Sequence, residues 1–236
     1  MISRRIAGGR FAPCLWPTLM TSLMLAALLS LGTWQVQRLH WKENLLATID
    51  TRLHQAPADV STLSNTEDVN YRHATASGTL QNTHIFYLSA ISQTGQGGYH
   101  ILTPLALADG TYLLADRGWI PYDHKNGDFS RPEGPITLSG ILRIPEHFWF
   151  QPPNNPAKND WYAIDFPALA TAAHIPALKP YLLEVDATDA QTYPTGGQTR
   201  VTIPNNHLVY AITWYGMAVA LLVIYLLSSF RKDAAD

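Results

Sequence analysis

Two long apolar runs lie near the ends of the chain. Residues 15–33 and 208–230 contain no Asp, Glu, Lys or Arg, and a helix needs roughly 20 apolar residues to cross about 30 Å of hydrocarbon. Trp16 and Trp34 bracket the first run, and their separation of 18 residues corresponds to about 27 Å of helix, close to the spacing of two interfacial aromatic belts. The pattern predicts transmembrane helices at 15–34 and 208–230.

The second run begins and ends with residues that are typical of helix termini. Asn205 and Asn206 follow Pro204, and their side chains are candidates to cap free amide N–H groups. Arg231 and Lys232 follow the run, and cations suit both a helix C-terminus and the cytoplasmic face of a membrane.

Small residues recur every four positions on both runs, and such stripes let two helices approach closely. We therefore predict that the two helices pack as a pair through these stripes, although small residues are also simply common in membrane helices. The stripes are Ser22, Ala26 and Ser30 on the first run and Gly216 and Ala220 on the second.

Charges near the runs are distributed unequally. Five cations lie on one side and three on the other: Arg4, Arg5, Arg10, Arg231 and Lys232 against Arg38, Lys42 and Arg200. This bias predicts that residues 1–14 and 231–236 are cytoplasmic (or in the mitochondrial matrix) and that residues 35–207 lie outside. A cleaved signal peptide is the alternative for the first run, but the run is long for one and lacks a clear A-x-A site.

Helical periodicity continues beyond the first run. Leu39, Leu46, Ile49 and Leu53 share one helix face, so the first helix is predicted to end just before Pro57.

From residue 71 onward, short β-like runs alternate with turn signals, and Asp109-Gly110 is a hairpin signal between two of them. The predicted fold class is an α+β membrane protein, in which two transmembrane helices flank a β-rich extracytoplasmic domain resembling an antiparallel barrel or sandwich. The predicted strands are 71–80, 84–91, 99–107, 111–117, 136–143, 161–165 and 181–185, with one short helix at 166–173.

Composition narrows the functional classes. Charged residues make up 14% of the chain and the net charge is −2, which argues against nucleic-acid binding. The single cysteine, Cys14, excludes an intrachain disulfide and a CxxC metal site. The histidines His84, His100 and His124 lack metal-ligand spacing. We find no nucleophile elbow, phosphate-binding glycine loop or H-E-x-x-H motif, so we predict that the chain is not an enzyme.

Six motifs in order, between two correctly placed apolar runs, resemble those of the Surfeit-locus protein 1 (Surf1/Shy1) family, the assembly factors of cytochrome c oxidase. One motif, residues 116–121, has Asp116 where the family usually has Asn. The six are Gly32, Trp34, Gln35, Arg38, Trp41 and Lys42; Tyr71-Arg72 with Gly78; Gly98-Tyr99 with Leu102 to Leu105; Asp116-Arg117-Gly118-Trp119-Ile120-Pro121; Asn154-Asn155-Pro156 with Asn159, Trp161-Tyr162 and Asp165; and Pro204 to Leu208 with Tyr210-Ala211, Thr213-Trp214 and Ala218.

The resemblance implies a factor that helps to mature a haem-copper oxidase, by transiently holding haem, with haem a expected, for the catalytic subunit. The implied partners are that subunit, proteins of haem synthesis or other assembly proteins, and membrane lipids. The implied location is the inner (plasma) membrane of a bacterium, or the mitochondrial inner membrane in a eukaryote.

His207 is the sharpest candidate for a haem-iron ligand, because a histidine in the first turn of a spanning helix lets the propionates reach the interface. Tyr210 and Trp214 follow on the same helix face. Arg38, Arg200 or Lys42 are candidates to pair with propionates. The alternative is a histidine that caps the helix or binds the headgroup region.

Further candidates concern partner contact. Trp34, Trp41 and Lys42 are expected near the interface, where membrane anchoring is the ordinary role and a contribution to the haem or oxidase surface the alternative. Arg117 and Trp119 end a predicted strand. In the structural interpretation Gly118 permits a bulge or a turn, Trp119 packs in the core and Arg117 pairs with a carboxylate; the alternative is partner docking.

Two other functions stay open. The chain is either a cofactor-free membrane scaffold that stabilises an oxidase assembly intermediate, or a membrane-anchored sensor that binds a small molecule. Residues 231–236 are too few for a signalling domain, which disfavours the sensor.

Overall fold

The computed structural model describes residues 4–6, 9–64, 68–92, 94–125, 127–146, 150–187, 192–199 and 204–232. It divides the chain into two compact units. Residues 1–47 and 202–236 form one unit, called here the helical unit, and residues 48–201 form the other, called the sheet domain.

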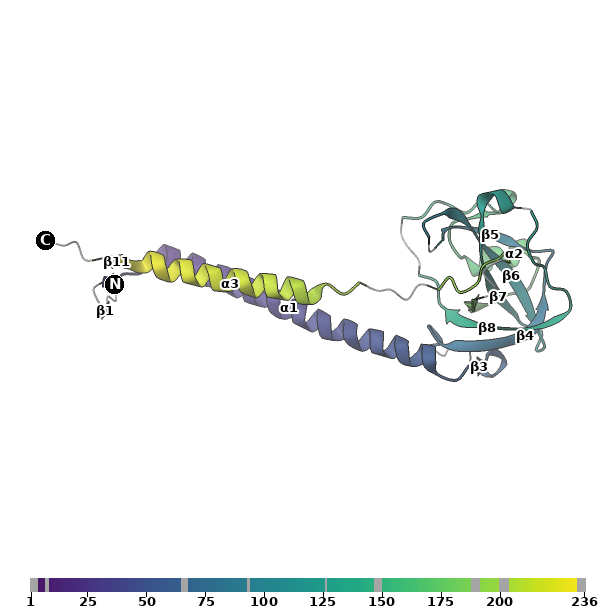
Figure 1. Cartoon of the computed structure of the whole chain (residues 1–236), viewed down its shortest axis with the longest axis horizontal. Coiled ribbons are helices and arrows are strands. Elements are labelled where there is room, and N and C mark those ends of the chain that lie inside the picture. The colour runs from purple at the N-terminus through teal and green to yellow at the C-terminus, as the bar shows by residue number, and fades with distance from the viewer. Residues whose placement is uncertain are drawn as a thin grey trace. The chain divides into compact units, whose positions relative to one another are not determined.

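Two long helices make up most of the helical unit (Figure 1). They are α1 (Leu15–His54), of which residues 15–47 belong to this unit, and α3 (His207–Ser229). Both helices are long and apolar enough to cross a membrane. Only 6% and 11% of their most apolar stretches are buried, so neither is the core helix of this fold. The single helix α1 passes through the first apolar run and ends before Pro57, which confirms that prediction.

The two helices pack side by side, as predicted, but through a different face. Thr18 and Thr33 of α1 hydrogen-bond the hydroxyls of Tyr225 and Tyr215, at 2.7 and 3.1 Å. The buried positions of α1 include Leu28, Gly32 and Gln35, and those of α3 are Ala211, Ala218 and Ser229. We call this contact the seam.

The predicted small-residue stripes are wrong as a contact surface, because Ser22, Ala26 and Ser30 are exposed. Large tyrosine side chains fill the seam, so a glycine is needed only where one of them crosses α1. A Cβ atom on Gly32 would lie 2.8 Å from the ring of Tyr215. The seam positions of α1 are spaced by four and three residues, as in a coiled coil.

A small antiparallel sheet joins the two terminal segments, where no strand was predicted. Strands β1 (Arg4–Ile6), β2 (Gly9–Phe11) and β11 (Phe230–Lys232) pair in the order β1-β2-β11. The rings of Phe11 and Phe230 are 5.3 Å apart. Both terminal segments therefore lie at the same end of the helix pair.

Asn206 occupies the N-cap position of α3 but makes no side-chain capping hydrogen bond, and the side-chain oxygen of Asn205 is buried without a partner among the described residues. The predicted side-chain cap is therefore wrong for both residues.

One sheet of eight strands, in the order β3-β4-β8-β10-β7-β6-β5-β9, forms the sheet domain (Figure 1). The strands are β3 (Ala58–Asp59), β4 (His73–Leu80), β5 (Phe86–Ile91), β6 (Gly97–Leu107), β7 (Tyr112–Pro121), β8 (Pro135–Arg143), β9 (Asp160–Trp161) and β10 (Leu178–Val185). The described part of the domain also contains helix α2 (Phe166–Ala172) and 3-10 turns at Val60–Thr62, Tyr122–His124 and Pro156–Lys158.

The sheet is mixed rather than antiparallel. β10 pairs in parallel with β7, and β3–β4 and β5–β9 are also parallel. An extra pairing of β4 with β6 links the five strands β4, β8, β10, β7 and β6 in a ring. The whole sheet is not a closed barrel, because its end strands β3 and β9 are not paired with each other in the described part of the chain. The predicted hairpin at Asp109-Gly110 joins β6 to β7, with Gly110 at φ 81°.

Side chains on β7 alternate between two cores, as expected for a strand buried on both faces. Leu113 and Ala115 belong to the larger core, which also contains Leu105, Leu142 and Leu183. The intervening Leu114 belongs to a second core, which also contains Trp161 and residues of helix α2 such as Leu169. Asp165 caps α2, accepting a hydrogen bond from the amide of Ala168.

β7 bulges at Gly118 and continues to Pro121, so Arg117-Gly118-Trp119 does not end the strand as predicted. Gly118 has φ 120°, and the register of β7 against β6 shifts at this point. A Cβ atom on Gly118 would lie 2.2 Å from the carbonyl oxygen of Thr195. The predicted glycine bulge is therefore confirmed.

Candidate functional site: a histidine oriented by the helix seam

His207 is the first residue of α3 and is half-buried. Its Nδ1 lies 2.7 Å from the side-chain oxygen Oε1 of Gln35 on α1. An amide oxygen can only accept, so Nδ1 carries the proton and donates it. The other ring nitrogen, Nε2, then keeps its lone pair for a ligand.

The sequence shows Gln35 only as one member of a motif, and reasoning from the sequence missed its role in orienting His207. It is 9% exposed, and a buried amide in apolar surroundings is costly unless it is hydrogen-bonded. The contact with His207 satisfies Gln35 and fixes the ring at the same time. The spacing of Gln35 from Leu28 and Gly32, by seven and three residues, is the pattern that places it in the seam.

The two predicted cofactor-binding aromatic residues lie on the helix face of His207. Tyr210 and Trp214 follow it by three and seven residues on α3; Tyr210 is 55% exposed and Trp214 is half-buried. Both are available beside the imidazole as an aromatic wall.

The predicted cations have different surroundings. Arg38 is exposed, with its guanidinium carbon 4.3 Å from the centre of the Trp41 ring. Lys42 donates a hydrogen bond to the carbonyl of Pro204 and so fastens α1 to the segment before α3. Arg200 lies outside the described residues. Trp34 and Trp41 are about half exposed, at 49% and 51%.

The surroundings of His207 offer a metal a single imidazole nitrogen as a ligand. Metal-ligating histidines usually donate their second ring N–H to an oxygen acceptor, as His207 does to Gln35. No group of three His, Cys, Asp or Glu side chains close enough to hold a metal ion occurs among the described residues. A porphyrin supplies four nitrogens of its own and needs only an axial side chain, so His207 fits a haem iron better than a free metal ion.

The two partner candidates on β7 lie inside the sheet domain. Trp119 is 6% exposed, and its backbone exchanges two hydrogen bonds with Thr195, of 3.0 and 2.9 Å. Arg117 is 7% exposed and donates to the carbonyl of Ser130. The predicted pairing of Arg117 with a carboxylate is therefore wrong, because the side chain points to a backbone oxygen instead. Its proposed role in partner contact stays a prediction.

Another polar cluster superficially resembles a catalytic triad. Asp186 lies 2.9 Å from Nε2 of His73 and accepts a hydrogen bond of 2.7 Å from Ser139, whose hydroxyl is 3.3 Å from the same Nε2. In a working triad the carboxylate and the nucleophile contact different ring nitrogens. Both partners here use one nitrogen, so this cluster is not such a triad.

Comparisons with known proteins point to one family. The model of the SURF1 family matches residues 23–219. The chain is 35% identical over 217 residues to Surfeit locus protein 1 of Homo sapiens, covering 80% of this chain and 70% of that protein. It is 32% identical to a SURF1-like protein of Monosiga brevicollis, with 83% and 80% covered, and 28% identical to Surfeit locus protein 1 of Takifugu rubripes, with 89% and 95% covered.

Proposed function

Because this chain belongs to the SURF1 family, we propose that it is an assembly factor of a haem-copper oxidase, and that it holds haem through His207 for the catalytic subunit. The observation that carries the proposal is the hydrogen bond of 2.7 Å from His207 Nδ1 to Gln35. It leaves Nε2 as the ring nitrogen that is able to ligate iron.

The proposal places α1 and α3 across the inner membrane, with the sheet domain on the outer side and both termini inside. Large apolar side chains are exposed along both helices, including Leu23 at 67%, Ile212 at 64% and Leu227 at 69%. Lipid covers such side chains at no cost. The terminal sheet supports a common side for both ends, because it pairs β2 with β11.

Haem is an amphipathic cofactor, and the residues around His207 match both of its parts. The exposed faces of Tyr210 and Trp214 offer apolar contact to the macrocycle beside the imidazole. Arg38, one turn from Gln35 on α1, is an exposed guanidinium suited to a propionate carboxylate. Bound haem would supply an iron with one protein ligand, and a single axial bond suits a carrier that must release its cargo.

Absorption spectroscopy of the purified full chain tests the proposal. The chain is isolated in detergent from haem-sufficient cells, and its Soret band is compared with those of His207→Ala and His40→Ala. His40 is an exposed histidine on α1, so its substitution controls for adventitious haem binding by surface imidazoles. We expect a Soret band in the wild type and in His40→Ala, and its loss in His207→Ala.

Two results would contradict haem binding at His207. A wild-type chain without a Soret band, even after haem is added, would favour the cofactor-free scaffold. A band of equal height in both variants would place haem elsewhere.

A further inference from the structure

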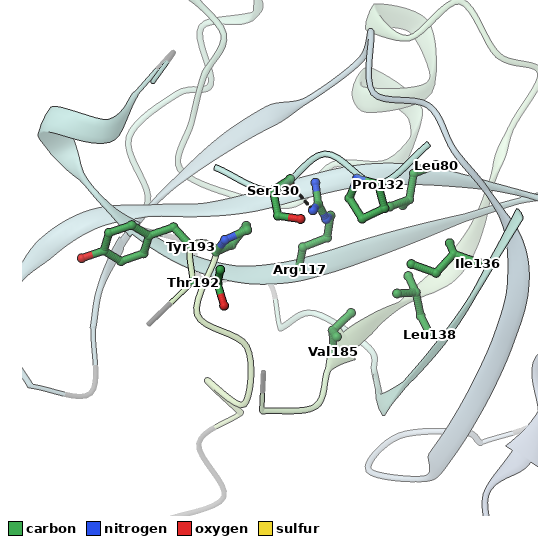
Figure 2. Close-up of a pocket in the computed structure, with 10 residues that line it drawn as sticks. Leu80, Arg117, Ser130, Pro132, Ile136, Leu138, Val185, Thr192 and Tyr193 are labelled. Atoms are coloured by element: carbon green, nitrogen blue, oxygen red, sulfur yellow. Dashed lines mark hydrogen bonds between the residues drawn. The ribbon is translucent and has the colours of Figure 1, made fainter. Parts of the chain in front are cut away.

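A pocket of about 200 Å³ lies at one end of the strand ring in the sheet domain. Its apolar wall is built by side chains of β4, β8 and β10: Leu80, Ile136, Leu138 and Val185. Figure 2 shows Arg117 of β7 between this wall and the segment that carries Thr192 and Tyr193. The pocket therefore combines an aliphatic wall with one guanidinium.

Arg117 reaches the pocket because of the alternation along β7. Leu113 and Ala115 face the larger core, and Arg117 continues the same face where that core ends. The bulge at Gly118 follows at once and turns the next side chains away from this register. A guanidinium is thus placed at the end of an otherwise apolar interior.

The guanidinium of Arg117 is not neutralised by the described part of the chain. It donates one hydrogen bond to the carbonyl of Ser130 (Figure 2), while its Nη1 is buried and has no acceptor among the described residues. Burial, and next the charge of Arg131, lower the pKa of Arg117 to about 10. The side chain is therefore still charged at neutral pH.

A buried charge without a counter-ion is unfavourable unless something neutralises it. A ligand anion in the pocket would do so, and it would also give Nη1 an acceptor. One cation is best matched by one negative charge, and a guanidinium binds carboxylates in preference to point anions, because its donors are coplanar.

From this geometry we propose that the pocket is a binding site for a small monocarboxylate with an apolar body, whose carboxylate pairs with Arg117 and whose hydrocarbon part lies against Leu80, Ile136 and Leu138. Its volume of about 200 Å³ is below the roughly 300–1,000 Å³ of pockets that hold drug-sized ligands. The site is therefore too small for a porphyrin, and it does not depend on haem binding at His207.

Calorimetric titration of the full chain in detergent micelles tests the site. The probes are cyclohexanecarboxylate and its neutral isostere cyclohexanecarboxamide, each corrected with protein-free micelles. We expect the carboxylate to bind at least tenfold more tightly than the carboxamide. In Arg117→Gln the affinity for the carboxylate should fall at least tenfold, to that of the carboxamide.

Two further variants separate binding from folding. Arg131→Gln removes a nearby but exposed guanidinium, which packs on Phe129. Because exposed charges are well screened, the preference of this variant for the carboxylate over the carboxamide should stay within about threefold of the wild-type preference. Leu138→Trp fills the apolar wall and leaves Arg117 intact, so it should abolish binding of both probes while thermal melting still shows a folded domain.

Three results would overturn the site: no binding of the carboxylate by the wild type, equal affinity for the two probes, or a carboxylate preference that survives in Arg117→Gln. A loss of preference in Arg131→Gln alone would assign the anion to the exposed guanidinium and would also overturn it. None of these results depends on the Soret band.

Discussion

Replacing Gln35 by Met tests whether the seam prepares His207 for iron. Methionine keeps the length of the side chain but removes the acceptor that lies 2.7 Å from Nδ1. In the haem-free variant the imidazole is able to turn its N–H toward water or headgroups. Once Nε2 is bound to iron, the ring is fixed and Nδ1–H is left without its acceptor.

The size of the effect follows from that difference. A buried donor left without a partner costs about 1–3 kcal/mol, and because the cost arises mainly in the bound state it appears in the affinity. Each 1.4 kcal/mol is a factor of about ten, so haem should bind Gln35→Met about 5- to 150-fold more weakly. Loss of outer hydrogen-bond partners typically weakens metal binding by about 10- to 100-fold.

The assay is a titration of the haem-free full chain with haem, followed at the Soret band. Gln37→Met is the matched control, since Gln37 lies two residues away on α1 and is exposed. Its Kd should equal that of the wild type.

Equal dissociation constants for Gln35→Met and Gln37→Met would refute the reasoning.

Three further predictions concern stability, and thermal melting of the full chain in detergent measures each. Gly118→Ala should destabilise the sheet domain by about 3 kcal/mol or more, because the backbone strain of a positive φ and the clash with the Thr195 carbonyl add. Gly110→Ala has open space around its new Cβ atom and should cost only about 1–2 kcal/mol. Equal losses of stability in the two variants would contradict the clash at Gly118. Gly32→Leu should cost about 1–3 kcal/mol of stability by overpacking the seam, while Ser22→Leu on the exposed face should change stability by less than about 0.5 kcal/mol. A larger loss in Ser22→Leu than in Gly32→Leu would indicate that the helices contact each other through the small-residue stripe instead. Burial first, then a nearby negative charge, raises the pKa of Glu184, so its contribution to stability is greatest below the ordinary carboxyl pKa and is lost as pH rises through the raised value. Glu184→Gln should therefore gain stability relative to the wild type as pH rises above about 4 and through the raised pKa of Glu184, and a difference that does not change with pH would contradict this.

Elements with local signals were predictable from the sequence. The apolar runs, and the helical spacing that continues beyond the first run, predicted α1 and α3 with ends within a few residues of those observed. The hairpin at Asp109-Gly110 was also predictable, because a glycine at positive φ is a local requirement of the turn.

Contacts between distant segments were not predictable in this way. The parallel pairing of β10 with β7 joins strands far apart in the chain, and neither strand's alternation specifies its neighbour. The terminal sheet likewise brings Phe11 to Phe230. The seam was misassigned because small residues alone do not mark a helix contact when tyrosines bridge it.

The candidate sites were only half predictable for the same reason. The position of His207 at the start of an apolar run is local, but its partner Gln35 is 172 residues away. Arg117 belongs to a recognisable motif, yet only the folded ring shows that its guanidinium is buried beside aliphatic side chains.

A common physical criterion separates these two residues from the other polar side chains near them. Arg38 and Lys42 already contact a ring and a backbone carbonyl, and either contact exists without a ligand. His207 and Arg117 each make one hydrogen bond that fixes the side chain and leave one nitrogen available, Nε2 and Nη1. The unliganded protein loses free energy of folding when it fixes a polar group whose capacity for hydrogen bonding or metal ligation is partly unused. A ligand of the right chemistry recovers that cost, which is why binding sites are sought where the fold leaves such a group.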